Sequence, residues 1–432
     1  MTAQQQRIAV YADWDGLPAP LRLGFLHTRR SAAQELFEFE FDAAALAHPA
    51  LAQTRLDPRL GHFAGPQYPP QGRSRFAMFA DASPDRWGRF LMRRRLEREQ
   101  RAGRIPSSTT LTESDYLLGV HDQYRVGALR FKRDDSGPFL DNQDSMGAPP
   151  LVQLRALEAA SIAIERDTHN DAPQGGDWLR MLIAPGGSLG GARPKASVVD
   201  PAGALWIAKF PSARDTQDDV DIGAWEMVVH TLARQCGIRV PASMIKRYAH
   251  PHHTFLVQRF DRTGSGSRRH FASAMTLTDH EDGDDAASGA SYLEIAEVLI
   301  RQGAQPKADL RELWTRIVFN LLVSNTDDHL RNHGFLLAPG HGWRLSEAYD
   351  MNPTPHASGL KLNISAADNA LDLGLALSVA HYFRIPSGEA QQIIAACSTV
   401  VRQWPVLANA LKIAPREQER MSSAFRLAYS SL

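Results

Sequence analysis

Three oxygen-bearing side chains near residue 330 have the types and the spacing of a catalytic metal site. Asp327 and Asn332 stand five residues apart, and Asp350 follows a stretch that reads as two short strands around the turn 339–342. Carboxylate and amide oxygens hold Mg2+ beside phosphate groups, and a further carboxylate can accept the proton of an attacking hydroxyl. Kinase catalytic loops place a base, an Asn and a metal-binding Asp in this order. The pattern therefore indicates phosphoryl transfer.

The same residues also have a plainer interpretation. Asp and Asn routinely cap helices and build turns, and Asp-x-x-x-x-Asn often arises by chance. The His-Arg-Asp and Asp-Phe-Gly tripeptides of eukaryotic kinases are absent from the chain. The pattern by itself leaves open either a turn that closes a buried helix or the catalytic loop of another type of kinase.

A glycine-rich segment upstream is a candidate for contacting phosphates. Gly186, Gly187, Gly190 and Gly191 lie within residues 185–195, and backbone N–H groups of such a loop can approach an anion closely. No Gly-Lys-Ser/Thr follows, so this is not a Walker A loop, and Gly-x-Gly-x-x-Gly is not matched either. Since glycine-rich turns that enter a hairpin are common, this segment is weak evidence alone.

Lys209 is a second candidate for the phosphate side of the site. It lies in the apolar run 205–210, which reads as a strand. Burying a lysine is costly unless a phosphate or a carboxylate pairs with it. Glu226, on the next predicted helix, is the candidate partner, as in the lysine–glutamate pairs of kinases. The alternative is a lysine on an edge strand that reaches solvent.

The elements expected around these residues follow from apolar spacing and turn signals. Positions 310, 313, 314, 317, 318, 321 and 322 are apolar at helical spacing, which predicts a buried helix running into residue 325. The other expected helices are 86–104, 151–166 and 224–235, followed by tail helices broken near Pro405 and Pro415. The expected strands are 8–11, 36–41, 196–199, 204–210, 254–260, 335–337 and 343–345. The turn Asp200-Pro-Ala-Gly203 is expected to join 196–199 and 204–210 into a hairpin. Residues 134–150 read as a loop or linker.

Several motifs together resemble the HipA-type kinases, the toxin half of HipBA-like toxin–antitoxin pairs. They span most of the chain in the family's order. They are Pro84-Asp-Arg-Trp-Gly-Arg89, Arg125-Val-Gly-Ala-Leu129, Ser188-Leu-Gly-Gly-Ala-Arg-Pro-Lys195, Trp206-Ile-Ala-Lys-Phe210, Glu226 with Leu232-Ala233, Gly237-Ile-Arg-Val-Pro241, Val257-Gln-Arg-Phe-Asp-Arg262, Asn325-Thr-Asp-Asp-His-Leu-Arg-Asn332 and Tyr349-Asp350.

The resemblance implies an α/β (α+β) protein with an atypical protein-kinase-like fold, made of a mixed α/β N-terminal lobe and an all-helical C-terminal lobe. It implies that Asp327 is the catalytic base and that Asn332 and Asp350 bind Mg2+. In the family, the serine at position 188 can be autophosphorylated, which displaces its loop and inactivates the kinase. The residues implied for ATP are Ser188, Leu189, Gly190, Gly191, Ala192, Lys209, Gln258, Phe260 and His329, with the backbone at Gln258 and Phe260 meeting the adenine.

The resemblance also implies a function and partners. The chain would be a serine/threonine kinase that arrests growth by phosphorylating a translation component, such as an aminoacyl-tRNA synthetase. A HipB-like helix-turn-helix antitoxin would neutralise it, and operator DNA would be reached mainly through that antitoxin. Two alternatives stay open: a kinase fold serving as a co-repressor or scaffold, and a small-molecule phosphotransferase. Arg193-Pro194 in place of the family's Gln-Glu and an acidic insertion at 281–285 leave the loop conformation open.

Length and composition set the outer limits of these expectations. A chain of 432 residues predicts two or three packed units, here 1–150, 151–290 and 291–432. The formal net charge is zero, which offers no general case for nucleic-acid or membrane binding. The eight arginines of 86–104 are either a solvated helix face or a contact for DNA or an acidic partner.

Cysteine usage and hydropathy predict a cytoplasmic protein. Cys236 and Cys397 are the only cysteines and stand far apart, so neither a disulfide framework nor a zinc site is expected. No segment approaches the roughly 18 apolar residues of a membrane span. The N-terminus lacks the apolar run of a signal peptide.

Overall fold

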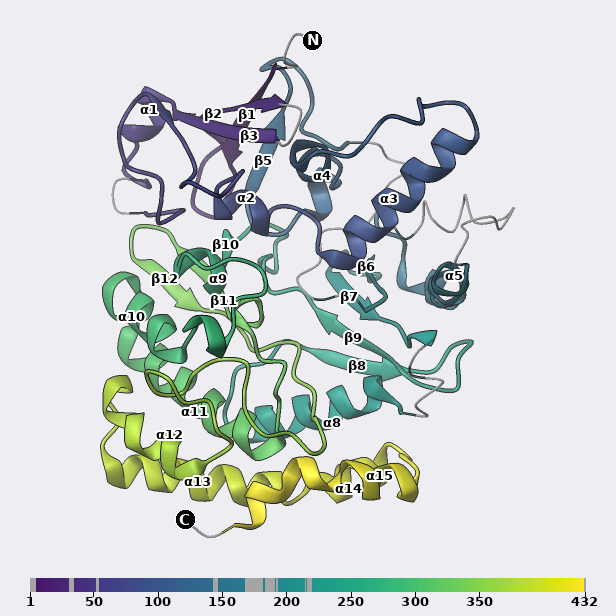
Figure 1. The fold of residues 1–432 in the computed structure, drawn as a ribbon, viewed down its shortest axis with the longest axis vertical. Helices are drawn as coiled ribbons and strands as arrows, with labels where there is room; N and C mark the ends of the chain where they lie inside the picture. Colours follow the sequence, from purple (N-terminus) through teal and green to yellow (C-terminus); the bar gives the residue numbers. More distant parts are fainter. Residues whose placement is uncertain are drawn as a thin grey trace. The chain divides into compact units, whose positions relative to one another are not determined.

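The structure is a computed structural model of the chain, and it forms two compact units that are interleaved in sequence. It describes residues 5–30, 35–51, 54–142, 147–167, 182, 191, 193–213, 215 and 220–430. The first unit contains Met1–Ala213 and Gln258–Ala272, and the second contains Arg214–Val257 and Ser273–Leu432. Figure 1 shows the ribbon coloured along the sequence. The division into three sequence regions stays a prediction.

An antiparallel sheet opens the first unit. Its strand order is β4-β3-β2-β1-β5. The register places Ile8 opposite Leu26 and Leu26 opposite Phe39, and all three side chains are buried, so one face of the sheet supplies apolar core. The expected strands at 8–11 and 36–41 are confirmed as β1 and β3, whereas β2 was not expected. The bounds are β1 (Gln5–Ala12), β2 (Leu21–Arg30), β3 (Glu35–Phe41), β4 (Pro66–Gln67) and β5 (Leu129–Lys132).

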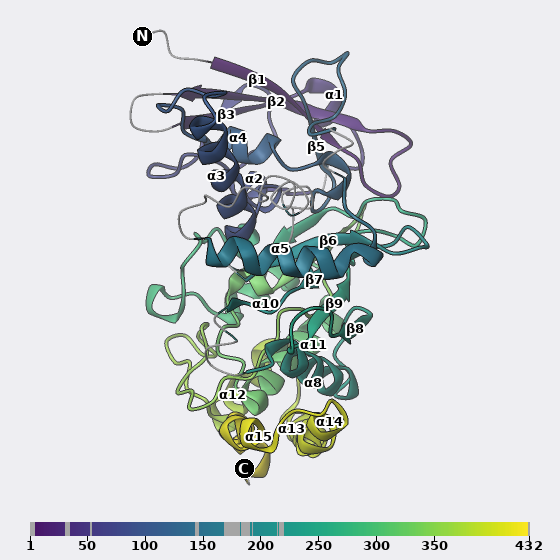
Figure 2. The ribbon, with the colours of Figure 1, turned by 90° about the vertical axis from the view of Figure 1, so that its right-hand side faces the viewer.

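A second part of the first unit carries the expected hairpin. β6 (Lys195–Val199) pairs antiparallel with β7 (Leu205–Lys209), and Lys195 faces Lys209 in the register. Asp200 closes the turn because its Oδ1 accepts hydrogen bonds from the backbone N–H groups of Ala202 and Ala204. The helix α5 (Leu154–Arg166) lies beside this hairpin (Figure 2). The hairpin predicted from the sequence is therefore confirmed.

The remaining helices of the first unit include the arginine-rich one, α3, which is confirmed at residues 86–101. Its Arg89 makes a two-pronged ion pair with Glu113, and Arg98 lies 3.9 Å from Asp167. Two arginines of α3 thus pair with carboxylates of the same unit. A contact of this helix with DNA or an acidic partner stays a prediction. The bounds are α1 (Ala43–Leu46), α2 (Ala77–Asp81), α3 (Arg86–Arg101), α4 (Glu113–Leu118), η1 (Asp122–Tyr124) and η3 (Leu151–Gln153).

Arg125 is the largest buried polar side chain at the centre of the first unit, with no solvent exposure. Its guanidinium donates hydrogen bonds to four backbone carbonyl oxygens, those of Ala82, Leu117, Val120 and Leu140. Burial lowers the pKa of Arg125 to about 10, which still leaves the group charged at neutral pH. This one side chain therefore joins three separate segments, near residue 82, at 117–120 and at 140.

Replacing Arg125 by Met is expected to destabilise the chain by about 3 kcal/mol or more, because four buried carbonyls lose their donor. Urea unfolding followed by circular dichroism measures the loss. Arg95→Met is the matched control, since Arg95 lies exposed on α3 and its loss is expected to cost less than about 0.5 kcal/mol. Equal unfolding midpoints for the two variants would contradict the assigned role of Arg125.

Helices form most of the second unit, together with two hairpins. β8 pairs with β9, and β11 pairs with β12. The helix α11 packs against α10, α13 and η7 (Figure 2). The bounds are α8 (Ile222–Gln235), β8 (Ser243–Lys246), β9 (Thr254–Gln258), β10 (Phe271–Ser273), α9 (Ala274–Leu277), η4 (Ala286–Ser288), α10 (Tyr292–Gln302), α11 (Pro306–Val323), η5 (Leu330–Asn332), β11 (Gly334–Ala338), β12 (Gly342–Leu345), α12 (Leu373–Val379), η6 (Ala380–Phe383), α13 (Ser387–Val401), α14 (Trp404–Ala410), α15 (Pro415–Met421) and η7 (Ser422–Tyr429).

The helix α11 delivers the chain to the candidate site. Pro306 occupies its first turn, where a missing N–H costs nothing, and every apolar position expected between 310 and 322 is buried. The helix ends at Ser324, whose φ of 49° is left-handed and turns the chain sharply into Asn325. The helix predicted from apolar spacing is confirmed.

The two cysteines are neighbours in the second unit. Cys236 Sγ lies 4.0 Å from the carbonyl oxygen of Cys397, because the end of α8 packs against α13, and both thiols are free. Their separation along the chain concealed this proximity. Among the described residues, no helix is both long and apolar enough to cross a membrane.

Candidate active site

Asp327 and Asn332 lie together in a tight turn directly after α11. The carbonyl oxygen of Asp327 accepts hydrogen bonds from the backbone N–H of His329 at 2.9 Å and from Asn332 Nδ2 at 3.0 Å. The backbone N–H of Asn332 in turn donates to the carbonyl oxygen of His329 at 2.8 Å. The Asp327 side chain itself makes none of these bonds and is exposed to solvent on one side.

Asn332 presents an oxygen that nothing in the described structure satisfies. The residue is 3% exposed, and its Oδ1 is buried with no hydrogen-bond partner among the described residues. A buried acceptor of this kind costs free energy unless a donor or a cation meets it. Since Nδ2 is already held by Asp327, the amide orientation is set and Oδ1 points elsewhere. The atom is suited to ligate a metal ion.

The β11–β12 hairpin returns the chain to bring Asp350 near this turn. Phe335 faces Leu345 in the hairpin, and Asp350 follows with a left-handed φ of 59°. The neighbouring Tyr349 hydroxyl donates to the carbonyl oxygen of Arg331 at 2.6 Å, which ties the two segments together. A left-handed backbone at a non-glycine residue is strained, and such strain gathers at functional sites.

The charge of Asp350 acts on the carboxylate of Asp327. Burial raises the pKa of Asp327; the charge of His329 opposes this rise and the charge of Asp350 adds to it, so that the pKa stands above its ordinary value. The charge of Lys361 lowers the pKa of Asp327. A divalent cation between Asp350 and the Asn332 oxygen would relieve the repulsion between the carboxylates. The carboxylate of Asp350 and the amide oxygen of Asn332 are therefore ligands of the kind taken by a metal that also binds phosphate oxygens.

Histidine and cysteine side chains offer no alternative metal site in the part of the chain that the structure describes. Among the described residues, no group of three or more His, Cys, Asp or Glu side chains gathers as a metal site. The three-histidine segment at 250–253 contains His250 and His252 in an edge-to-face ring contact, while His253 Nδ1 lies 2.6 Å from Asp221. His253 and Asp221 thus serve the turn that opens α8.

The residues expected to contact ATP belong largely to the first unit. Lys209 ends β7 and is 9% exposed, and Gln258 and Phe260 are half-buried at the end of β9 and just beyond it. Gly191 is described, whereas Ser188, Leu189, Gly190 and Ala192 lie outside the described residues. Glu226 lies on α8 of the second unit and is 5% exposed. Its pairing with Lys209 stays a prediction, as do the ATP contacts.

Two charged groups of the first unit were missed by sequence reasoning. Lys195 Nζ lies 3.1 Å from Asp85, with both side chains almost fully buried, and donates to the Gly191 carbonyl oxygen at 2.7 Å. Asp261 accepts from Arg259 and from the backbone N–H of Gly127. Burial opposes the ionisation of Asp261, but the charges of Arg259 and its neighbour Arg262 hold its pKa well below the ordinary range. These contacts join residues of four of the quoted motifs, those at 84–89, 125–129, 188–195 and 257–262.

The acidic insertion at 281–285 folds against cations of its own unit. Asp285 lies 3.3 Å from Lys361, and Asp282 lies 3.8 Å from Arg331, which belongs to the turn that carries Asn332. Asp285 also caps η4 through the backbone N–H of Ala287. The insertion is therefore an ordered part of the surroundings of the candidate site.

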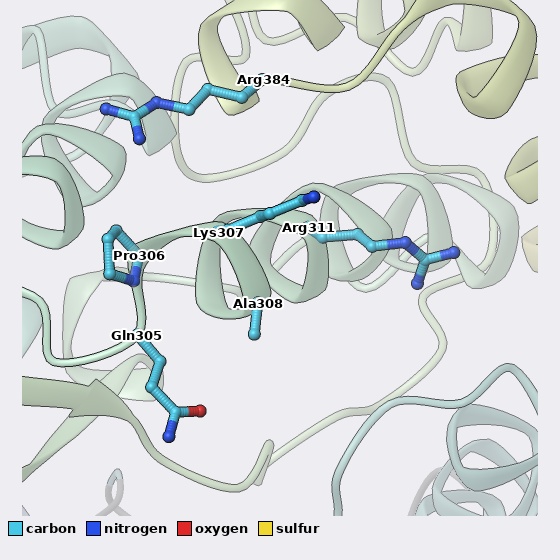
Figure 3. A pocket seen from close by; sticks show the side chains of 6 residues that line it. All are labelled: Gln305, Pro306, Lys307, Ala308, Arg311 and Arg384. Carbon is cyan, nitrogen blue, oxygen red and sulfur yellow. The ribbon is translucent and has the colours of Figure 1, made fainter.

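An open pocket at the start of α11 contains none of the predicted site residues. Its cationic side chains point in different directions in Figure 3, and Arg311 is paired with Glu389 at 2.7 Å. Converging cations are what an anion site requires. We assign the pocket no role. Its lining residues are Gln305, Pro306, Lys307, Ala308, Arg311 and Arg384.

Comparison with protein families and curated proteins gives a consistent result. The family model of the HipA-like C-terminal domain matches residues 187–404, which is half of the chain. A protein of Haemophilus influenzae named "Putative kinase" is 28% identical over 128 residues, covering 28% of this chain and 37% of that protein. "Putative kinase Y4mE" of Sinorhizobium fredii is 27% identical over 253 residues, covering 53% and 55%. The chain spans about half or less of the length of these curated relatives.

A solved structure resembles the chain over nearly its whole length. It is HipA of Shewanella oneidensis MR-1, in a complex with HipB and its operator DNA. The TM-score is 0.64 at 15% sequence identity, and the match covers 98% of this chain and 95% of that one. At this identity the similarity shows the fold, and the expected kinase-like fold of mixed helix and sheet is confirmed.

Proposed function

Because the chain belongs to the HipA-like family, we propose that it is an ATP-dependent serine/threonine protein kinase acting as the toxin of a toxin–antitoxin pair. One observation carries the catalytic part of this proposal. The orphan Oδ1 of Asn332 is buried beside Asp327, whose pKa is influenced by Asp350. A cation bound there would satisfy this acceptor, which the described residues leave without a hydrogen-bond donor.

Each residue of the set has a chemical task in this proposal. Asn332 and Asp350 hold Mg2+, and Lys209 contacts the phosphates of ATP. When bound, Mg2+ neutralises charge on the phosphates that would repel an attacking oxygen. Asp327 accepts the proton of the substrate hydroxyl, and its raised pKa makes it a stronger base than an ordinary carboxylate. Its exposed side faces the solvent from which a protein substrate would arrive.

The proposed partners follow from the family and from the structural neighbour, which was solved with HipB and operator DNA. We propose a HipB-like helix-turn-helix antitoxin in the cytoplasm, and contact with operator DNA mainly through that antitoxin. The formal net charge of zero agrees with an indirect contact. The proposed substrate is a translation component such as an aminoacyl-tRNA synthetase, and Ser188 is the proposed site of autophosphorylation.

Expression without an antitoxin is expected to stop bacterial growth, and Lys209→Met is expected to abolish this effect. Removing a phosphate-binding cation should cost about 100-fold or more in phosphoryl transfer. The rate of phosphoryl transfer is measured as the transfer of labelled γ-phosphate from ATP to the proteins of a cell extract. Lys246→Met is the matched control, because Lys246 is an exposed lysine on β8.

The outcomes of this experiment separate the alternatives. Label on small molecules but not on proteins would favour a small-molecule phosphotransferase. No ATP turnover by the unmodified chain, combined with tight antitoxin binding, would favour a co-repressor or scaffold. Phosphopeptide mapping of the same reaction tests Ser188, and an unmodified Ser188 would exclude self-inactivation at that residue.

A further inference from the structure

The carboxylate next to the candidate base is buried, and one of its oxygens makes three contacts. Asp328 is 3% exposed, and a single oxygen, Oδ2, is met by three side chains. The Tyr292 hydroxyl donates at 2.6 Å, Asn320 Nδ2 donates at 2.8 Å, and His333 Nε2 lies at 2.7 Å. These groups come from the start of α10, the end of α11 and the residue after η5.

The position of this contact in the sequence matters for the site. Asp328 directly follows Asp327, and His333 directly follows Asn332. The Asp328–His333 contact therefore joins the residue after Asp327 to the residue after Asn332 and closes the turn. The Asn332 side chain supplies a second tie by donating to the carbonyl oxygen of Asp327.

The same network continues toward the second candidate metal ligand. Asn320 Oδ1 accepts a hydrogen bond from Asn325 Nδ2 at 3.1 Å. Asn325 Oδ1 accepts one from the backbone N–H of Asn352 at 3.2 Å, and Asn352 lies two residues after Asp350. A chain of buried polar contacts thus runs from the turn of Asp327 to the segment that carries Asp350.

A buried charge of this kind is retained only where it is compensated. Burial raises the pKa of Asp328, but the charge and hydrogen bond of His333 and the hydroxyl of Tyr292 outweigh burial, so the pKa lies below its ordinary value. The rings of Tyr292 and His333 meet edge to face at 5.6 Å. Hydrogen bonds between buried side chains are strong in a low-dielectric interior and restrict the motion of the segments that they join. The turn of Asp327 and Asn332 is thus held to α10 and α11 through Asp328.

We propose that Asp328 and His333 are a positioning pair that fixes the separation between Asp327, Asn332 and Asp350. The pair touches neither ATP nor substrate and acts through the backbone of the turn. The expected effect of the pair on kcat rests on the proposed function, whereas its expected effect on the geometry of the turn does not. A merely structural role would change stability and leave the geometry of the turn intact.

Two substitutions at His333 test the pair. His333→Leu keeps approximate volume but removes the contact with Asp328, and it is expected to lower kcat about 100-fold with a much smaller change in KM for ATP. His333→Gln retains an N–H donor and is expected to restore about 10-fold of that loss. His341→Leu is the matched control, because His341 is exposed in the β11–β12 turn.

Hydrogen exchange of residues 325–333, measured without nucleotide, decides the positioning claim independently of activity. His333→Leu should accelerate exchange of the backbone N–H groups of His329 and Asn332, whereas His341→Leu should not. If a folded His333→Leu chain has the same exchange rates and the same kcat as the unmodified protein, the inference is wrong. If the unmodified chain does not turn over ATP, the kinase proposal fails, and the exchange rates still decide the role of the pair.

Discussion

Asp327→Asn is expected to reduce phosphoryl transfer by about 1000-fold or more, because the substrate hydroxyl loses the group that accepts its proton. The fold should survive, because the turn is held by the carbonyl oxygen of Asp327 and not by its side chain. The pKa of Asp327 is raised in the folded chain, so its ionisation at neutral pH opposes folding. The neutral amide removes that opposition, and the melting temperature should equal or exceed that of the unmodified chain.

Three measurements test this expectation: phosphoryl transfer, growth inhibition and thermal unfolding. Asp368→Asn is the matched control, because Asp368 is an exposed carboxylate of the same unit whose Oδ1 only closes a local turn. Its transfer rate should stay close to that of the unmodified chain. Persistent toxicity of a folded Asp327→Asn chain would exclude a kinase-based toxin, whatever the other residues do.

Asp350→Asn is expected to change two properties at once. It should weaken metal-dependent ATP binding by about 100-fold, because the metal loses a charged ligand. It should also move the acidic limb of the kcat/KM profile to lower pH. Burial and then the negative charge of Asp350 raise the pKa of Asp327, so removing that charge lowers the pKa and keeps the base ionised in more acidic solution.

The two effects of Asp350→Asn have separate measurements. Calorimetric titration of ATP with and without Mg2+ gives the metal dependence, and kcat/KM between about pH 4 and 8 gives the limb. Asp372→Asn is the control, since Asp372 caps α12 through the backbone N–H of Gly374. If ATP binding by Asp350→Asn depends on Mg2+ as it does in the unmodified chain, Asp350 is not a metal ligand. A limb that moves to higher pH would contradict the electrostatic coupling with Asp327.

Both predictions depend on elements that the sequence by itself determined. The helix α11 was predictable because its apolar residues recur at helical spacing, and the β6–β7 hairpin because Asp200 and Gly203 mark its turn. The turn that carries Asp327 and Asn332 and the hairpin that leads to Asp350 were also predictable, because turn and hairpin signals lie in short stretches of sequence. The strand β2 escaped the same reasoning, because its mixed polar and apolar residues gain their meaning from the partners β1 and β3.

Only the tertiary structure decided how the residues near 330 behave. Five neighbouring polar residues look alike in the sequence, yet Asp327 is exposed on one side while Asp328 is buried under Tyr292 and His333. The orphan oxygen of Asn332 and the raised pKa of Asp327 depend on which atoms surround them, including Asp350 beyond the hairpin. Residue type and spacing are local properties, whereas burial and charge–charge distance arise only when distant segments pack together.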